Sequence, residues 1–128
     1  MKSLGVEIKS STCVLVLLDS ADEIREATKI ELEDPYCATS VKDFFENLKT
    51  WLEKCDVDVV NIKKRLEKGK FAGGASSFKT EGLIQLAASV PVNLVGGPEL
   101  NRLAKSLETL PAMKKYQEQA FLAALSAL

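Results

Sequence analysis

The stretch LGVEIKSSTCVLVLLDS, at residues 4–20, predicts two β-strands that are joined by a tight turn at Ser10 and Ser11. Its second half, CVLVLL, is apolar at every position, so this strand should be buried on both faces, as in the middle of a sheet. The following EIREATKIEL alternates apolar and charged residues, which favours an edge strand with one face in water. We therefore expect an antiparallel meander over residues 4–9, 12–18 and 23–32.

After the meander, helical and strand patterns alternate. Apolar residues recur at helical spacing from Phe44 to Cys55, and Ser40 with Asp43 approximates a capping box before them. VDVVNI at residues 57–62 and VNLVGG at 92–97 predict two more buried strands. Further helices are expected to begin at Ser77, at Gly97-Pro98 and at Pro111.

This order of elements predicts an α/β fold with a mixed five-stranded sheet. Strands 57–62 and 92–95 should run parallel to the first strand on its other side, with helices on both faces and a single domain over residues 1–128. Gly82 lies inside a predicted helix, where glycine costs about 1 kcal/mol against alanine. We therefore expect its backbone to pack very close to another element.

The same order is similar to the ribonuclease H-like fold, which RNases H, Holliday-junction resolvases and the sugar kinase–actin group share. The opening hairpin carries an acid, Glu7, on its first strand ahead of a turn of small residues, as in that fold. KGKFAGGASSFKTEGLIQL, at residues 68–86, resembles a small bacterial family of proteins of unknown function (domain of unknown function 3010). The resemblance covers most of the chain and implies a fold but no reaction.

For the nucleases of this fold, the resemblance implies carboxylates that hold two magnesium ions about 4 Å apart. Glu7 matches the position on the first strand. The fourth strand has Asn61 or a lysine where an acid is expected, and the last helix offers Glu118 next to Gln119, which is the better match. Glu81 is a substitute ligand or an ordinary acid at a helix start. The catalytic candidates are thus Glu7, Glu81 and Glu118, and the metal candidates are Glu7 and Glu118.

A basic stretch follows the fourth predicted strand. Residues 1–58 carry 7 basic and 13 acidic side chains, whereas residues 63–79 carry 6 basic and 1 acidic. Glycines, lysines and a helix start are the ingredients of a phosphate-binding loop, although the order fits neither a Walker A motif nor a dinucleotide fingerprint. The candidate anion-binding residues are Lys63, Lys64, Arg65, Lys68, Lys70, Gly73, Gly74, Ser76, Ser77 and Lys79.

Two alternatives accompany this interpretation of the basic stretch. The lysines are equally explained as a solvated loop that pairs with the acidic half of the chain. Phe71 and Phe78 flank the glycines and suit stacking on nucleic-acid bases, but such residues more often belong to a core.

Composition excludes several classes of protein. The 128 residues are 46% hydrophobic and 27% charged, and they contain neither a bilayer-length apolar stretch nor a secretion signal, so we expect a cytoplasmic protein without membrane contact. There is no histidine and no CxxC pair, which argues against a zinc site and a histidine base. The three cysteines, Cys13, Cys37 and Cys55, are expected to fill the core.

The sequence therefore predicts a nucleic-acid- or phosphate-binding module on a nuclease-type scaffold with an eroded metal site and no certain cofactor. One alternative is a divergent magnesium-dependent nuclease or resolvase. The other is a non-catalytic homo-oligomer, such as a homodimer, in which the edge strand 23–32 and the apolar end 120–128 contact a partner.

Overall fold

The first strand, β1 (Ser3–Lys9), is the central strand of a five-stranded sheet in the order β3-β2-β1-β4-β5. The computed structural model describes residues 1–65 and 74–128. Antiparallel pairing joins β1 to β2 (Thr12–Ser20) and β2 to β3 (Glu23–Glu31), which confirms the meander. On the other side of β1, β4 (Val59–Lys63) and then β5 (Val92–Val95) run parallel to it, also as expected.

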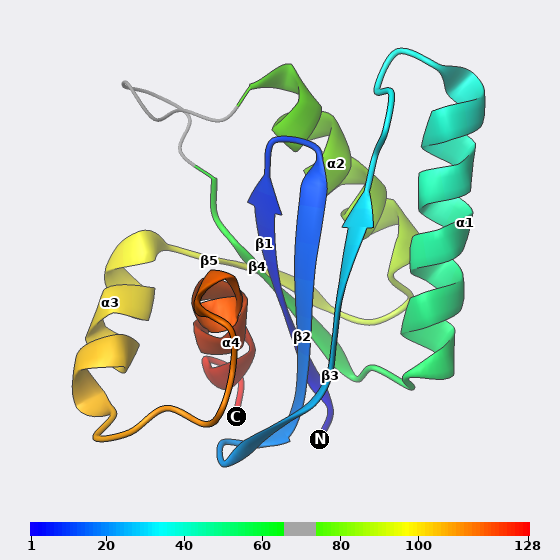
Figure 1. Ribbon diagram of the computed structural model, residues 1–128. Helices are drawn as coiled ribbons and strands as arrows, with labels where there is room; N and C mark the ends of the chain where they lie inside the picture. Colours follow the sequence, from blue (N-terminus) through cyan, green and yellow to red (C-terminus); the bar gives the residue numbers. More distant parts are fainter. Residues whose placement is uncertain (66–73) are drawn as a thin grey trace.

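Helices cover both faces of this sheet (Figure 1). Helix α1 (Ala38–Lys54) and helix α2 (Ala75–Ala87) pack on one face. Helix α3 (Gly97–Ser106) and helix α4 (Glu118–Leu125), which a 3₁₀ turn at Lys115–Gln117 precedes, cover the other. No described helix is both long and apolar enough to cross a bilayer.

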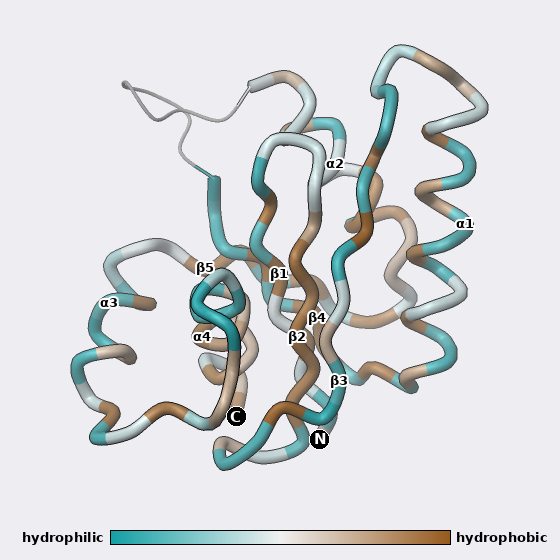
Figure 2. The backbone as a smooth tube through the Cα atoms, viewed as in Figure 1, coloured by the Kyte–Doolittle hydropathy of each residue, from teal (hydrophilic) through white to brown (hydrophobic). Residues whose placement is uncertain are grey.

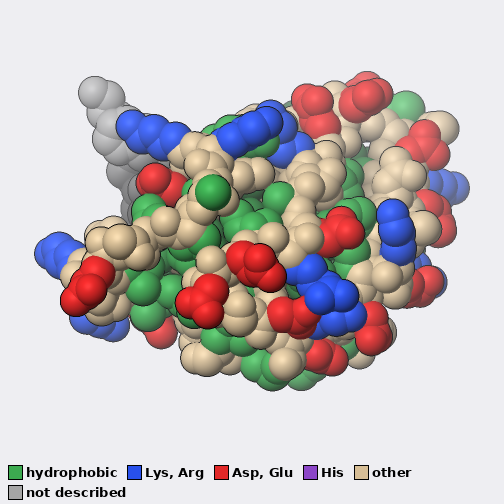
Figure 3. Space-filling view, turned by 60° about the horizontal axis from the view of Figure 1, so that its bottom comes forward, with side chains coloured by type: hydrophobic (Ala, Val, Ile, Leu, Met, Phe, Trp, Pro, Cys, Tyr) green, Lys and Arg blue, Asp and Glu red, His purple; other side chains and the backbone are tan. Residues whose placement is uncertain are grey.

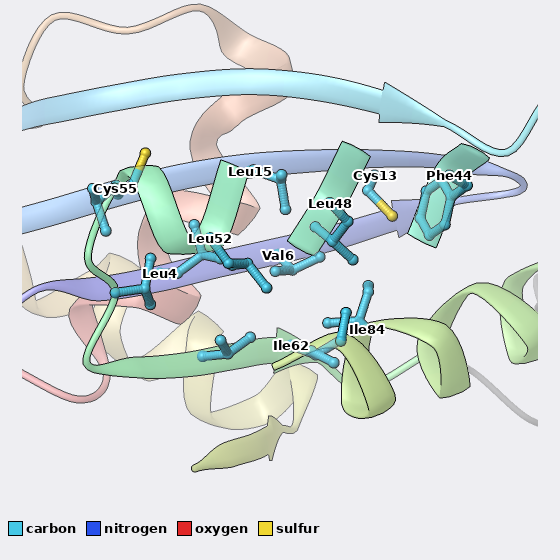
Figure 4. Close-up of a cluster of buried hydrophobic side chains, with 14 of the residues drawn as sticks. Leu4, Val6, Cys13, Leu15, Phe44, Leu48, Leu52, Cys55, Ile62 and Ile84 are labelled. Atoms are coloured by element: carbon cyan, nitrogen blue, oxygen red, sulfur yellow. The ribbon is translucent and has the colours of Figure 1, made fainter. Parts of the chain in front are cut away.

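Strand β2 contributes to two hydrophobic cores, one on each face of the sheet. Cys13, Leu15 and Leu17 point into the core under α1 and α2, part of which is drawn in Figure 4. Val14, Val16 and Leu18 point into the core under α3 and α4. The strand is accordingly apolar along its middle (Figure 2), and its continuous apolar run follows from burial on both sides.

Helix α4 lies directly against β1 at Gly5. A Cβ atom there would overlap the carbonyl oxygen of Ala120 and lie 2.5 Å from the backbone nitrogen of Ala124. The Ser3 hydroxyl, also on this face of the strand, donates a hydrogen bond of 2.7 Å to the carbonyl oxygen of Ala124. The glycine thus sets how closely the last helix approaches the central strand.

The expectation for the other glycine, Gly82, is wrong. Gly82 is exposed, and a Cβ atom added to it would meet nothing within 4 Å. Helical periodicity identified its helix correctly, but the exposed side of that helix has no neighbour within the described part of the chain at this position. The close approach inferred for Gly82 occurs instead at Gly5.

The structure also differs from the expected start of two helices and from the expected burial of β5. Helix α1 begins at Ala38 without a side-chain cap, because the Ser40 hydroxyl instead accepts a hydrogen bond of 2.8 Å from the backbone nitrogen of Asp34. The helix expected from Pro111 begins only after the 3₁₀ turn. Strand β5 is an edge strand, in which only Val95 is buried.

The apolar end of the chain is not an open partner surface. Residues 120–124 of α4 are buried against β1 and β2 of their own chain. A helix that is apolar almost all round must be covered, and here the sheet and α3 supply the cover. Residues 120–124 therefore need no partner to cover them, whereas Leu128 is exposed and a homodimer stays a prediction.

The cysteines differ in their environments. Cys13 and Cys55 are buried core residues as expected, whereas Cys37 is exposed just before α1. Burial raises the pKa of the Cys13 thiol to about 12 and also raises the pKa of Cys55. Because the thiolate is the reactive form, the two buried cysteines are chemically inert at neutral pH.

Candidate anion-binding site

A hollow of about 570 Å³ lies at the edge of the sheet where β1, β4 and β5 end. The carboxyl ends of parallel strands meet at this edge, which is where α/β folds usually bind ligands. We call it the basic hollow, because the described residues that line it include four cationic side chains and one acidic side chain. The cations are Lys9, Lys63, Lys64 and Arg65, and the acid is Glu7.

Strand pairing places the beginning of the basic stretch in this hollow. Lys63 is the last residue of β4 and pairs with Val95 of β5, and the backbone nitrogen of Lys64 donates a hydrogen bond of 2.7 Å to the carbonyl oxygen of Val95. The chain is therefore held to the sheet as far as Lys64, whose side chain is exposed. Figure 3 shows Lys and Arg side chains at the upper left of its view, next to the grey atoms, whereas acidic and basic side chains are mixed over the rest of this face.

The Glu7 carboxylate lies between two ammonium groups. Its Oε2 is 3.5 Å from Nζ of Lys63, and its Oε1 is 3.6 Å from Nζ of Lys9. Because Gly5 pairs with Asn61 in the parallel register, Lys63 is the β4 residue next to Glu7. The position where the resemblance implied a second acid therefore holds a lysine.

These side chains do not fit a magnesium site. Oε1 of Glu7 is inaccessible and has no hydrogen-bond partner in residues 1–65 and 74–128, but an ammonium group already faces each carboxylate oxygen. Hard divalent cations need several oxygen ligands, and positive charge at this distance opposes their binding. Within the same ranges, no group of three or more His, Cys, Asp and Glu side chains is arranged to hold a metal ion.

The other acidic candidates lie in two different places. Glu118 and Gln119, at the start of α4, line a second hollow together with Glu7, and Gln119 also lines the basic hollow. Glu81 belongs to α2, which packs on the opposite face of the sheet from α4, and its carboxylate is 3.8 Å from Nε of Arg65. The structure thus brings Glu7 and Glu118 to one hollow and leaves Glu81 outside it.

Asn61 holds neighbouring strands together through its side-chain hydrogen bonds. It is buried, and its Nδ2 donates hydrogen bonds to the Ser3 hydroxyl at 2.9 Å and to the carbonyl oxygen of Leu4 at 3.2 Å. Its Oδ1 accepts one from Nδ2 of Asn93 at 3.1 Å. These bonds tie β1, β4 and β5 together beneath α4, and they use the amide as both donor and acceptor.

Two helix N-termini open into the basic hollow. Gly74 precedes α2 and Gly97 begins α3, and both line the hollow. The N-caps of both helices are glycines, and no side chain of the described residues caps either helix, so backbone N–H groups of the first turns, apart from Pro98, which has none, can face an anion. The Ser77 side chain lines the hollow as well, and its hydroxyl donates to the carbonyl oxygen of Gly74 at 2.7 Å.

Some of the predicted anion-binding residues lie elsewhere. The Lys79 ammonium donates a hydrogen bond to the carbonyl oxygen of Pro35, beside the start of α1, so this lysine does not join the basic hollow. Ser76 does not line the hollow either; its carbonyl oxygen accepts a hydrogen bond from Thr80. Lys68, Lys70 and Gly73 lie outside the described residues, as does Phe71.

Arg65 connects the hollow to α2. Its guanidinium group is 4.7 Å from the centre of the Phe78 ring, and its Nε is 3.8 Å from the Glu81 carboxylate. The side chains of Arg65 and Glu81 are only 15% and 12% exposed. Phe78 is 63% exposed, so the alternative that it is a core residue does not apply.

Sequence reasoning missed Lys9 and Gly97 as site residues. Lys9 follows Glu7 by two positions and so lies on the same face of β1, a relation that strand periodicity would have indicated. Gly97 belongs to a strand–glycine–helix pattern like that before α2. The signal that would have united them is that parallel strands end at one edge of a sheet.

The meander, the two parallel strands and the helices on both faces define the ribonuclease H-like fold. Thermus thermophilus RuvC has this architecture: its structure matches with a TM-score of 0.77 at 14% identity, over 98% of this chain and 92% of RuvC. Its complex with a Holliday junction substrate matches with a TM-score of 0.76 at 13% identity, over 98% and 91%. The ROK hexokinase from Thermus thermophilus matches at 0.54 and 12%, over 82% of this chain and 38% of the kinase. These identities show the fold alone.

The family follows from the sequence itself. Residues 1–127 match the model of the family described as "Protein of unknown function (DUF3010)", and the chain belongs to that family. No curated protein sequence matches the chain. The resemblance inferred from residues 68–86 and from the order of elements is thereby confirmed.

Proposed function

We propose that this protein binds nucleic acid through its phosphodiester backbone in the basic hollow and does not cleave it. One observation carries the proposal: four cationic side chains and two helix N-termini without side-chain caps open into the same hollow. Among residues 1–65 and 74–128, the only acidic side chain that lines the hollow is Glu7, and the ammonium groups of Lys9 and Lys63 face it. Positive charge concentrated in this way attracts a polyanion even though the whole chain has a net charge of −1.

The groups in the hollow suit successive phosphates. Exposed lysines such as Lys64 provide mobile point charges. Arg65 lines the hollow with a planar guanidinium group, a shape that matches phosphate oxygens, although this group also pairs with Glu81. Backbone N–H groups at the start of α2 and α3 add donors of fixed direction. A ligand that spans more than one phosphate would use all three kinds of group.

The shared fold also supports a nucleic acid over a free phosphate compound. The structure of a RuvC of the same architecture is known in complex with a Holliday junction substrate, so this scaffold can accommodate branched DNA. A nucleic-acid ligand also agrees with the cytoplasmic location that we expect for this chain.

We predict that the protein does not cleave RNA, single-stranded DNA or branched DNA in magnesium or manganese. The reason is that Lys9 and Lys63 occupy the space around Glu7 in which a divalent cation would have to bind. Gel assays with the wild type and with Glu7→Gln as the control for contaminating nucleases measure this. Metal-dependent cleavage that disappears in Glu7→Gln would establish the divergent nuclease instead.

Removing two lysines of the hollow should weaken binding and flatten its salt dependence. In Lys9→Ala/Lys64→Ala, we expect lower affinity for short DNA of any sequence and a slope of log affinity against log salt that is smaller by roughly one to two units. With fewer phosphate contacts, binding releases fewer counterions from the nucleic acid, and this lowers the slope. Fluorescence anisotropy with labelled single-stranded, duplex and four-way-junction DNA at several salt concentrations measures both quantities.

A control variant separates local from overall charge. Lys49→Ala/Lys54→Ala removes the same charge from exposed positions of α1, away from the hollow, and should leave the slope unchanged. Equal slopes in the wild type and both variants would overturn the proposal and leave these lysines as a solvated surface. Lys49→Ala/Lys54→Ala should keep the stability of the wild type to within about 0.5 kcal/mol. Lys9→Ala/Lys64→Ala leaves Lys63 beside Glu7 but removes the ammonium group that faces its Oε1, so its stability is measured by urea unfolding before the affinities are compared.

A further inference from the structure

Phe78 is an aromatic side chain in an unusual place. It lies in the first turn of α2 with 63% of its surface exposed, although its neighbours Ser77 and Thr80 point into the protein. The hydrophobic core does not need it, because Ile84 and Ala87 supply the apolar contacts of this helix. An exposed ring of this size offers a flat apolar surface to a ligand.

The Phe78 side chain does not line the basic hollow itself, but its ring contacts Arg65, which does. Arg65, which lines the hollow, carries its guanidinium group over the ring at 4.7 Å from the ring centre. Gly74 and Ser77, within one turn of Phe78, line the hollow as well. A strand whose phosphates occupy the hollow would therefore bring its bases close to this ring.

Arg65 contacts one face of the Phe78 ring and is itself fixed by Glu81. Glu81 pairs with Arg65 at 3.8 Å, and both side chains are largely buried, so the guanidinium group has little freedom. A cation over an aromatic ring is attracted to its face. The guanidinium group thus covers one face of the Phe78 ring, and the exposed surface that remains is available for stacking.

We infer that an unpaired base of the bound nucleic acid stacks on Phe78, so that the site prefers single-stranded or locally unpaired nucleic acid to continuous duplex. Stacking on an aromatic side chain tolerates every base, because each base has a π-face. In a duplex, neighbouring base pairs already cover those faces. This inference rests on the proposed function and adds the structural class of the ligand to it.

Substitutions at Phe78 test the inference with three ligands: a single-stranded oligothymidylate, a duplex of the same length, and inorganic polyphosphate, a polyanion without bases. Phe78→Ala and Phe78→Leu should lower affinity for the oligothymidylate about 5- to 20-fold, as the loss of one base–aromatic stack does, and leave affinity for polyphosphate unchanged. Phe78→Leu keeps an apolar side chain but removes the π-face. Phe78→Trp should retain affinity, and its added indole fluorescence should be quenched on binding.

Leu86→Ala is the matched control, because Leu86 is also exposed, at 72%, on the same helix two turns away. It should change none of the affinities. Equal losses for oligothymidylate and polyphosphate in Phe78→Ala would overturn the inference, since Phe78 would then act only through Arg65. Unchanged affinity in Phe78→Ala, or a change of oligomeric state in both Phe78→Ala and Leu86→Ala by sedimentation, would overturn it as well.

The outcome also separates this inference from the function on which it rests. A wild type that binds neither oligothymidylate nor polyphosphate overturns both. A wild type that binds both with the expected salt dependence, while the Phe78 variants bind as it does, overturns the stacking of a base alone.

Discussion

Gly5→Ala is expected to destabilise the protein by about 3 kcal/mol or more, because overpacking against rigid neighbours costs at the upper end of its usual range. The new methyl group would overlap backbone atoms of Ala120 and Ala124, which no side-chain rotation can relieve. Helix α4 would have to move away from β1 and lose contacts to the sheet along its length. Urea unfolding followed by circular dichroism measures the difference in the free energy of unfolding.

Gly82→Ala provides the comparison, because the same methyl group there enters open space in the interior of a helix. We expect this variant to be more stable than the wild type by about 1 kcal/mol, through the better helix propensity of alanine. The two substitutions thus differ in sign. Equal stabilities of the wild type and Gly5→Ala would mean that α4 does not lie as close to β1 as the structure shows.

Asn61→Asp is expected to destabilise the protein by about 3 kcal/mol at neutral pH, since an unpaired buried charge costs more than an unpaired neutral group. The substitution removes the donor to Ser3 and Leu4 and turns a carboxylate towards the Leu4 carbonyl oxygen. Asn47→Asp is the control, because Asn47 is exposed on α1 and should change stability by less than about 0.5 kcal/mol.

The cost of Asn61→Asp should depend on pH in one direction. Burial raises the pKa of the introduced carboxyl group in the folded state above its unfolded value of about 3.9. A raised folded pKa favours folding below the unfolded pKa, and this advantage is lost as the pH rises. The deficit relative to the wild type should therefore shrink as the pH falls from the raised folded pKa and be smallest below about pH 4. A variant of full stability that binds manganese would instead identify Asn61 as the remnant of a metal ligand.

Much of the fold was predictable from local pattern. The apolar run of residues 13–18 and the alternation of residues 23–32 identified a central and an edge strand, because burial on two faces or on one leaves different patterns. The start of α4 was not predictable, because the residues after Pro111 fit a helix locally but lie as an irregular segment. The close backbone approach was expected at Gly82 but occurs at Gly5 for a similar reason, since only the packed structure shows which glycine a helix covers.

The site was predictable where it is local in sequence. Lys63, Lys64 and Arg65 stand together in the chain and lie together in the hollow. Lys79 appeared equivalent by charge, but the direction of its side chain on α2 takes it to Pro35. Parallel register decided that Lys63 rather than Asn61 lies beside Glu7, and the fourth strand alone could not distinguish the two residues.

The contact between β1 and α4 also bears on how the chain acquires its structure during synthesis. Residues 3–5 leave the ribosome long before residues 120–124, and one side of this central strand stays uncovered until those later residues have been made. Contacts between such distant segments slow folding, because a long loop must close before they form. We therefore expect nascent chains in which α4 has not yet emerged to expose an apolar sheet face and to depend on chaperones.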